Sequence, residues 1–320
     1  MAGVRWVALI LLGGGAGDLE GTYHLCSSIF HYEPDTTYVL LVCDSAEAAF
    51  QAAKIRTRFG DRITTMVAPP KHPVDARGKY LGANVLYGLG LIEDRLQGAF
   101  VLKLDADSLL IGPISERVSG FLDSNTECGI CGTLGRTNAR EDPTYGQELE
   151  ITSPLVRMIL ALPSEQWLYI SSLTDHDLLQ YARNDSTLAG NLRACATISG
   201  PAQQAIRRGY GWLEYCQGGG YAISWPLLTA MRSNGYLAHA PQLRNLPTGE
   251  DVLLSMYCRS LGFRVMDYSD SGQPFACAWR GLPYSAEVLL QRRHAVIHSL
   301  KGDKRASREE LQLLFQSLRV

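Results

Sequence analysis

Four short, mainly apolar segments in the first third of the chain alternate with helix-like segments, and this alternation limits the possible folds more than any other feature. Units in which a strand is followed by a helix and a second strand build a parallel sheet. The predicted strands are Val7–Leu12, Tyr38–Cys43, Ile63–Val67 and Ala99–Leu104, and the predicted helices are Ser45–Phe59 and Lys79–Leu91. We therefore predict an α/β fold with a mostly parallel central sheet.

The middle of the chain has a different character. From Arg136 to Tyr210 the sequence is polar and helix-like, and we expect a mostly helical insertion there. Strand and helix patterns return at Gly218–Ser224, Glu250–Leu261 and Phe263–Asp267. The second half of the chain is therefore expected to add to the same domain after the insertion.

A final helix is predicted at Arg308–Leu318. Ser307 and Glu310 have the spacing of a capping box, in which each side chain bonds the backbone N–H of the other residue. Apolar residues at one helical face pack against the rest of a domain. The residues expected to do so here are Leu311, Leu313, Leu314 and Leu318.

The overall composition favours a globular protein without a nucleic-acid partner. Hydrophobic residues make up 46% and charged residues 19%, and the net charge is only −2. Nucleic acids require a concentrated basic surface, which this balance gives no reason to expect. The apolar segment Val7–Leu12 is short for a signal peptide, and no other stretch approaches the ~20 apolar residues of a transmembrane helix. We expect a cytoplasmic protein without a transmembrane segment.

Among the eight cysteines, Cys128 and Cys131 have the spacing of a redox or zinc motif. There is no second such pair and no histidine cluster beside them. A structural thiol pair within a strand or turn is the favoured interpretation.

The strongest functional motif is Asp105-Ala-Asp107, which directly follows the predicted strand ending at Leu104. Ligands of open parallel sheets bind beyond the carboxyl ends of the strands. Residues two apart in a strand point the same way, so both carboxylates could address one ligand. Hard divalent cations prefer oxygen ligands and bind substrate phosphates at their remaining positions. Two solvated or capping aspartates in a loop remain the alternative.

Three further motifs follow along the chain, and each also has an ordinary structural explanation. The glycines of Gln217–Ser224 allow close approach of a ligand to the backbone, or a β-bulge. The acids of Thr248–Leu254 provide a catalytic carboxylate, or cap a helix. The histidine of Ala295–Gly302 provides a ligand for a manganese-like ion, or packs in the core.

Taken in this order, the four motifs resemble those of the GT-A fold glycosyltransferases, and most closely the fringe and β1,3-galactosyltransferase-like branch. The resemblance spans most of the chain and weakens in the insertion. It implies a Rossmann-like GT-A fold with a nucleotide-sugar-binding half at 1–135, a helical insertion at 136–210 that we associate with the acceptor, and an acceptor and catalytic half with a C-terminal helix at 211–320.

The resemblance also implies roles for individual residues. Asp107, Asp105 and His298 would hold Mn²⁺ or Mg²⁺, and Asp251 would be the catalytic base with Glu250 as its neighbour and substitute. The residues implied in donor binding are Leu11, Gly13, Asp44, Lys79, Asn84, Asp105, Ala106, Gly219, Gly220 and Lys301. Ala106 departs from the branch, which often carries a third acid at this position.

The implied activity is metal-dependent transfer of a hexosyl or N-acetylhexosaminyl group, with inversion, from a nucleotide-diphosphate sugar. The expected donor is a UDP-sugar. The acceptor would be a hydroxyl of a glycan, a lipid-linked sugar or a small molecule, as in a bacterial-type cytoplasmic enzyme.

Two other functions remain open. Leu11–Gly17 resembles the glycine-rich start of sugar nucleotidyltransferases, although Asp18 and Leu19 stand where those enzymes usually carry Thr and Arg. An acid there would repel a triphosphate. The second alternative is a carbohydrate-binding protein that keeps the fold without catalysis, because a fold does not dictate an activity.

Overall fold

The computed structural model describes residues 6–13, 15–34, 37–69, 81–135, 186–211, 214–245 and 249–319 of the chain. Most of the predicted insertion at 136–210 lies outside these ranges, and so does Lys79, a predicted donor contact. The later part of this segment forms helix α10 (Ser186–Arg207). The helical insertion at 136–210 as a whole stays a prediction.

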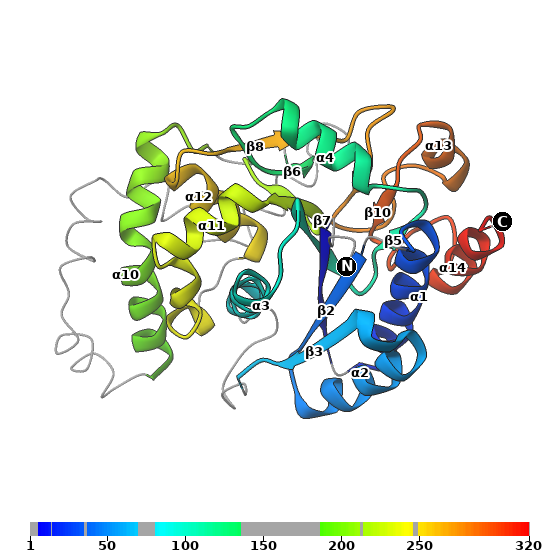
Figure 1. Ribbon diagram of the computed structural model, residues 1–320, viewed down its shortest axis with the longest axis horizontal. Helices are drawn as coiled ribbons and strands as arrows, with labels where there is room; N and C mark the ends of the chain where they lie inside the picture. The colour runs from blue at the N-terminus through cyan, green and yellow to red at the C-terminus, as the bar shows by residue number, and fades with distance from the viewer. Residues whose placement is uncertain are drawn as a thin grey trace.

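A seven-stranded sheet forms the centre of the protein (Figure 1). Its strands are β1 (Trp6–Leu12), β2 (Thr37–Cys43), β3 (Ile63–Val67), β4 (Phe100–Asp105), β6 (Cys128–Leu134), β7 (Cys216–Ser224) and β8 (Arg264–Asp267). Their order is β3-β2-β1-β4-β7-β6-β8, and of these seven strands β7 alone runs antiparallel to its neighbours. The predicted α/β fold with a mostly parallel sheet is confirmed.

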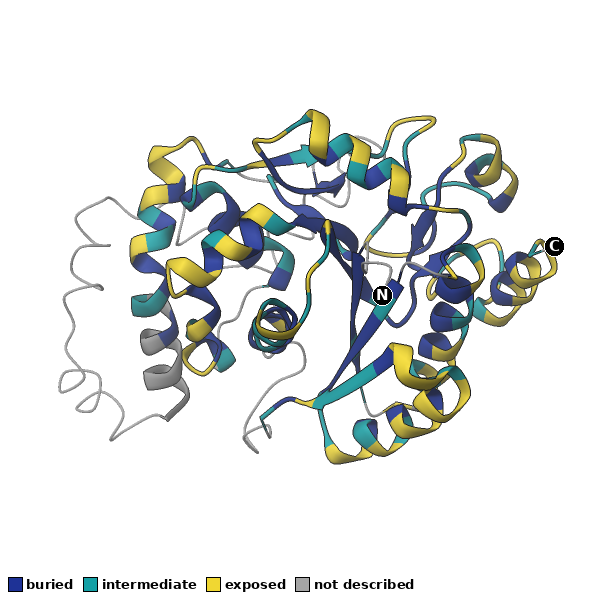
Figure 2. Ribbon diagram, in the orientation of Figure 1, coloured by how far each residue is buried: buried dark blue, intermediate teal, exposed yellow. Residues whose placement is uncertain are grey.

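Helices cover both faces of this sheet, because successive side chains of a strand point to opposite faces. Val7 and Leu9 of β1 pack with α3, α10, α11 and α12, whereas Trp6 and Ala8 pack with α1, α2 and α4. Figure 2 shows the buried strands between helices whose outer sides are exposed. These helices are α1 (Ala16–Tyr32), α2 (Ala46–Phe59), α3 (Leu81–Arg95), α4 (Ser115–Ser124), α11 (Trp225–Ser233) and α12 (Glu250–Ser260), together with α10. Short 3-10 turns lie at Gly60–Arg62, Tyr236–His239 and Gln242–Asn245. Within the described residues, no helix combines the length and apolar character needed to cross a bilayer.

The strand order reverses between β1 and β4. From β1 the chain continues to β2 and β3 on one side, and β4 then pairs with β1 on the other side. In open α/β sheets, ligands bind in the crevice that forms beyond the carboxyl ends of the strands at such a point. Leu11 near the end of β1 is paired in register with Asp105 at the end of β4. The first aspartate of the acidic motif therefore lies at the predicted crevice.

A second, three-stranded sheet brings the end of the chain to the same place. It consists of β5 (Leu109–Leu110), β10 (Val296–His298) and β9 (Phe275–Cys277), in that order. β5 follows closely after β4, and Ile297 pairs with Leu109. This pairing carries the end of β10 toward the end of β4. Helices α13 (Ala286–Gln291) and α14 (Arg308–Ser317) pack on this smaller sheet.

The last helix agrees with its predicted start but not with its predicted packing face. The capping box is present, because Ser307 Oγ accepts a hydrogen bond from Glu310 N, and Glu310 Oε2 accepts one from Ser307 N. The prediction that all four leucines pack on one face is wrong, since residues two apart lie about 200° apart around a helix. The buried residues are Leu311, Gln312 and Phe315, and the exposed ones are Leu313, Leu314 and Leu318.

Cys128 and Cys131 lie in β6, as buried free thiols. This confirms their interpretation as structural residues of a strand. The hydrogen bond with Cys128 and, next, burial raise the pKa of Cys131 well above its usual value, so Cys131 stays a neutral thiol.

Candidate active site

A cavity with a volume of about 290 Å³ opens beyond the carboxyl ends of β1 and β4. Of the predicted donor contacts that the structure describes, all except Gly219 and Gly220 line this cavity. Four carboxylates face it, and among the lining residues that the structure describes Lys301 is the one cation. The lining residues are Leu11, Leu12, Gly13, Asp18, Val42, Asp44, Leu81, Asn84, Asp105, Ala106, Asp107 and Lys301.

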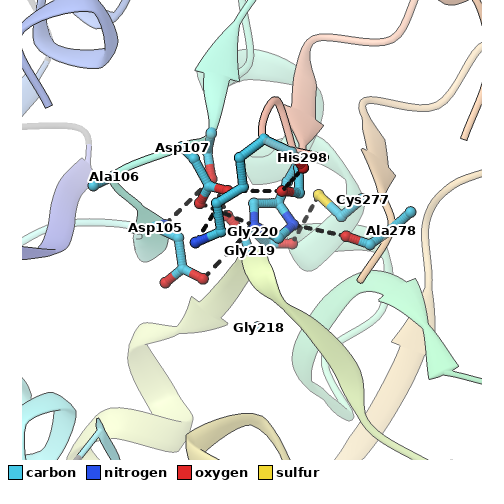
Figure 3. Close-up of polar contacts among 12 residues, drawn as sticks. Asp105, Ala106, Asp107, Gly218, Gly219, Gly220, Cys277, Ala278 and His298 are labelled. Atoms are coloured by element: carbon cyan, nitrogen blue, oxygen red, sulfur yellow. Dashed lines mark hydrogen bonds and ion pairs between the residues drawn. The ribbon is translucent and has the colours of Figure 1, made fainter. Parts of the chain in front are cut away.

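The three predicted metal ligands converge at one edge of this cavity (Figure 3). One ligand atom from each of Asp105, Asp107 and His298 lies within 4.8 Å of the other two. His298 Nε2 is 3.2 Å from Asp107 Oδ1 and 3.8 Å from Asp105 Oδ2. Two carboxylates and an imidazole are a ligand set suited to Mn²⁺, and carboxylates also suit Mg²⁺. The residues present therefore fit a divalent cation.

Backbone and side-chain hydrogen bonds hold the acidic turn against the end of β10. Leu300 N donates to the carbonyl oxygen of Asp107 at 3.1 Å, and Ser299 Oγ donates to Asp107 Oδ2 at 2.7 Å. Within the turn, Ser108 N donates to the carbonyl oxygen of Asp105 at 3.0 Å. The site is thus fixed by the fold on both sides and does not depend on a flexible loop.

The orientation of His298 is that of a metal ligand. Its Nδ1 lies 2.8 Å from the carbonyl oxygen of Ala278. Because a carbonyl can only accept, Nδ1 carries the proton, and a neutral ring then turns the lone pair of Nε2 toward Asp107. Two acceptors that face each other need a positive charge between them, from a proton or a metal ion. Metal-binding histidines typically donate their other ring N–H in this way.

Asp107 is held in its ionised form, as a metal ligand must be. Burial alone would raise the pKa of Asp107, but the hydrogen bonds from Ser299 and from His298, when Nε2 also carries a proton, and the charge of Lys301 together hold that pKa well below its usual range. Lys301 Nζ lies 3.5 Å from Asp107 Oδ2, although the lysine side chain is 71% exposed. Lys301 can therefore turn from this carboxylate to another anion without losing much of its contact with solvent.

The glycines of β7 make room for the side chains of the site. A Cβ atom at Gly219 would lie 1.9 Å from Cγ of His298, so the imidazole rests directly on the strand backbone. A Cβ at Gly220 would lie 2.9 Å from Val296 Cγ1 and 3.0 Å from Cys277 Sγ. Gly219 thus supports the metal-site histidine. The contact of these glycines with donor and acceptor stays a prediction.

Lys103 connects the metal site to the acid pair of α12. It is fully buried in β4, and its Nζ donates to Asp105 Oδ1 and to Glu250 Oε1, each at 2.6 Å, and also to the carbonyl oxygen of Gly218. Burial would lower the pKa of Lys103, but the two carboxylates raise it above its usual value. Lys103 is therefore a permanent cation shared by Asp105 and Glu250.

Asp251 is the carboxylate of this region that is ready to accept a proton. It lies in the first turn of α12, where its Oδ1 accepts a hydrogen bond from Val252 N at 2.8 Å. Burial, and next the adjacent charge of Glu250, raises the pKa of Asp251 to about 7. A general base works best when its pKa lies near the operating pH. Asp251 has that property.

Sequence analysis assigned no role to Lys103, although the sequence contains a signal for one. A lysine between Leu102 and Leu104, inside a strand that is apolar on both faces, has to be buried, and buried charges are nearly always paired. The pairing partners could not be predicted, because Glu250 lies 147 residues farther along the chain. Ala278 and Ser299, which orient the metal site, act through a carbonyl and a hydroxyl and leave no comparable signal.

The sequence matches no protein-family model and none of the curated proteins. Among solved structures, a mannosyltransferase from Pyrobaculum calidifontis in complex with GDP-Man and Mn²⁺ aligns with a TM-score of 0.38 at 10% identity, over 83% of this chain and 55% of its own. The apo form of mouse xyloside xylosyltransferase 1 aligns with a TM-score of 0.43 at 12% identity, over 92% of this chain and 96% of its own.

S. aureus TarS in complex with UDP-GlcNAc aligns with a TM-score of 0.29 at 13% identity, over 41% of this chain and 34% of its own. The chain thus spans about half the length of the mannosyltransferase and a third of TarS. At these scores the likenesses leave the function of this chain open, and the fringe and β1,3-galactosyltransferase-like branch stays a prediction.

Proposed function

We propose that the protein is a metal-dependent glycosyltransferase of the GT-A type, which moves a sugar from a nucleotide-diphosphate sugar to an acceptor hydroxyl. The observation that carries the proposal is the convergence of Asp105, Asp107 and His298 beside a cavity at the strand-order reversal of the sheet. Lys103 links Asp105 of the metal site to Glu250, and Asp251, the next residue after Glu250, would supply the base that such a transfer needs.

The charges of the cavity support a cation-dependent anionic ligand. Asp18, Asp44, Asp105 and Asp107 face the cavity, and Lys301 is the one cation in the described part of its lining. Like charges a few ångströms apart repel by several kcal/mol at an effective dielectric of about 20. A diphosphate would therefore bind weakly here unless a divalent cation lay between it and the carboxylates. The bound cation would also stabilise the negative charge of the leaving diphosphate.

Other residues of the chain would supply the base and the contacts to the donor. Asp251 would take the proton from the acceptor hydroxyl while that oxygen bonds to the anomeric carbon and the bond to the diphosphate breaks. Glu250 is held by Lys103 and is less suited to this role. Lys301 could turn from Asp107 to a donor phosphate, and Asn84 and Asp44 would face the nucleoside. A single displacement of this kind inverts the anomeric centre, and inversion and a UDP-sugar donor remain part of the proposal.

The two alternatives are less well supported. Asp18 lies in the cavity, where its charge would oppose the triphosphate that a sugar nucleotidyltransferase binds. A binding protein without turnover would need no carboxylate with a pKa of about 7 beside its metal site, and this carboxylate is present at Asp251.

A ligand screen tests the proposal. Thermal unfolding of the full chain is measured with a panel of nucleotide-diphosphate sugars, each with and without Mn²⁺. Because a ligand specific for the folded state raises the apparent stability, at least one donor should raise the melting temperature only when Mn²⁺ is present. The selected donor is then incubated with hydroxyl acceptors, and transfer is measured. If no donor stabilises the protein in a Mn²⁺-dependent manner, the proposal is wrong.

A further inference from the structure

An ion pair of Lys103 and Glu250 lies beside Gly218, which Asp251 also approaches: a Cβ atom at Gly218 would lie 2.7 Å from Glu250 Oε1 and 3.5 Å from Asp251 Oδ2. Glu250 precedes Asp251 in the first turn of α12 and is only 4% exposed, and Lys103 reaches Glu250 from β4 without any solvent contact of its own. The ammonium and the Glu250 carboxylate are 2.6 Å apart. Side chains with such short contacts and no exposure have little freedom to reorient. The geometry around the proposed base is therefore fixed before any substrate binds.

The remaining charged and titratable groups near Asp251 come from three elements. Asp105 of β4 adds a distant negative charge on the metal side. Tyr221 of β7 is buried, and its hydroxyl stays neutral because burial and the nearby acids raise its pKa well above the usual value. Tyr210, whose hydroxyl donates to the carbonyl oxygen of Val252, is kept neutral by burial in the same way. Lys103 is thus the cation that faces this group within the described residues.

We propose that Lys103 and Glu250 are positioning residues for Asp251: they form a buried opposite-charge pair that engages Glu250 and leaves Asp251 as the available carboxylate of the two acids. The role of Asp251 as a catalytic base rests on the proposed function, whereas the effect of the two neighbouring charges on the pKa of Asp251 does not. Glu250 is engaged by Lys103 and is unavailable as a base. Its negative charge strengthens the hold of Asp251 on a proton, and the positive charge of Lys103 limits that effect.

The two members of the pair should therefore act on Asp251 with opposite signs. A neighbouring like charge favours the protonated form of a carboxyl group, and a neighbouring opposite charge favours the ionised form, typically by about one to three pKa units at close range. Removing Glu250 alone should lower the pKa of Asp251, and removing Lys103 alone should raise it. Removing both takes away one charge of each sign and should leave the pKa near its starting value. A purely structural role would not produce this pattern.

The test is a carbon-13 NMR titration of the aspartate carboxyl groups in the metal-free full chain, with the Asp251 signal assigned by its absence from Asp251→Asn. Glu250→Gln should lower the titration midpoint by about one unit, and Lys103→Met should raise it by about one unit. The double variant should titrate close to the unmodified protein. Glu33→Gln is the matched control, because Glu33 is also 4% exposed but lies at the C-terminal end of α1, where its side chain bonds the start of α4. It should leave the Asp251 midpoint unchanged.

Lys103→Met alone leaves two carboxylates without their cation and is the variant most at risk of not folding. If Lys103→Met does not fold, the titration midpoints of Glu250→Gln and of the double variant still test the proposal. A midpoint that stays fixed or rises in Glu250→Gln overturns the proposal, and so does a double variant that shifts more than either single variant. Because the titration uses no metal, donor or acceptor, its result is independent of the transfer assay. Transfer activity with unmoved midpoints would reject this inference alone, and shifted midpoints without any transfer would reject the proposed function alone.

Discussion

His298 Nε2 lies 3.2 Å from Asp107 Oδ1, although 191 residues separate the two in the chain. The contact follows from the pairing of β10 with β5, the short strand directly after the acidic turn. A metal site assembled in this way depends on the backbone that supports each ligand as much as on the ligands. Changes to residues that never touch the ion should therefore alter its affinity.

Gly219→Ala should weaken Mn²⁺ binding without removing any ligand. The added Cβ would lie 1.9 Å from Cγ of His298, so the imidazole has to move away from the carboxylates. Disturbing groups that orient a metal ligand typically costs about 10–100-fold in affinity. Calorimetric titration with Mn²⁺ measures the effect. Gly120→Ala is the control, since an added Cβ there meets nothing within 4 Å. Equal Mn²⁺ affinity of the two variants would contradict the proposed packing of His298 on β7.

Asp251→Asn should abolish transfer while donor binding is retained. The amide cannot take the proton of an acceptor hydroxyl, and a positioned base contributes about 10²–10⁴-fold to a rate. Donor binding is followed by the Mn²⁺-dependent thermal shift, and transfer by product formation. Full activity of the double variant Asp251→Asn, Glu250→Gln would show that neither carboxylate is the base.

The same substitution should stabilise the metal-free protein at neutral and alkaline pH. The pKa of Asp251 rises on folding from 3.8 to about 7, so between these values the folded protein binds a proton that the unfolded chain releases. Stability contributed by this group is present below pH 4, falls as the pH rises towards 7, and stays low above that. Asn removes the charge, and we expect a gain of about 1–3 kcal/mol at pH 8 that vanishes near pH 4. Urea unfolding at a series of pH values measures it.

Asp303→Asn should change the folding stability at pH 8 in the opposite direction in the same experiment. The hydrogen bonds from Arg305 outweigh burial and lower the pKa of Asp303, so its stabilising contribution is present at pH 8 and is lost as the pH falls through its folded value. This variant should be less stable than the unmodified protein at pH 8. If Asp251→Asn behaved in the same direction as Asp303→Asn, the raised pKa of Asp251 would be contradicted.

Glu33→Ala should destabilise the fold without affecting the site. Glu33 Oε1 accepts hydrogen bonds from Ile114 N at 2.7 Å and Ser115 N at 2.9 Å, and so caps α4, whose own N-cap residue provides no side-chain hydrogen bond. Leaving buried donors unsatisfied at a helix start costs about 1–3 kcal/mol. Chemical denaturation measures the loss. Mn²⁺ affinity should stay unchanged, and a parallel loss of Mn²⁺ binding would show that α4 and the site are coupled.

The sequence predicts the first four strands of the larger sheet well, because parallel strands buried on both faces are short, continuous apolar segments, whereas helix α1 was not predicted. Ile63–Val67 was predicted with its observed bounds, and the other three strands differ by one residue at one or both ends. The packing face of α14 was predicted wrongly, because which side of a leucine-rich helix is buried depends on where the smaller sheet lies. Leu311 and Phe315 meet that sheet, and Leu313 points away.

The residues of the candidate site could likewise be predicted from the sequence only in part. Asp105, Asp107 and His298 could be named from their positions after strands, but their convergence depends on a pairing between β5 and β10 that is too short to recognise in a sequence. The link from Lys103 to Glu250 spans the sheet and a helix, and no local pattern reports it. Long-range electrostatic partners require the fold, whereas strand-terminal acids do not.

The proposed function requires a divalent cation held by the side chains at residues 105, 107 and 298. Binding of Mn²⁺ to the unmodified protein and to Asp107→Asn, measured by electron paramagnetic resonance of the free ion with and without a nucleoside diphosphate, tests it. We predict that the unmodified protein removes free Mn²⁺ from solution and does so more strongly when the diphosphate is present, and that Asp107→Asn loses both effects. Mn²⁺ binding that is absent in the unmodified protein, or equal in the two proteins, would contradict the account.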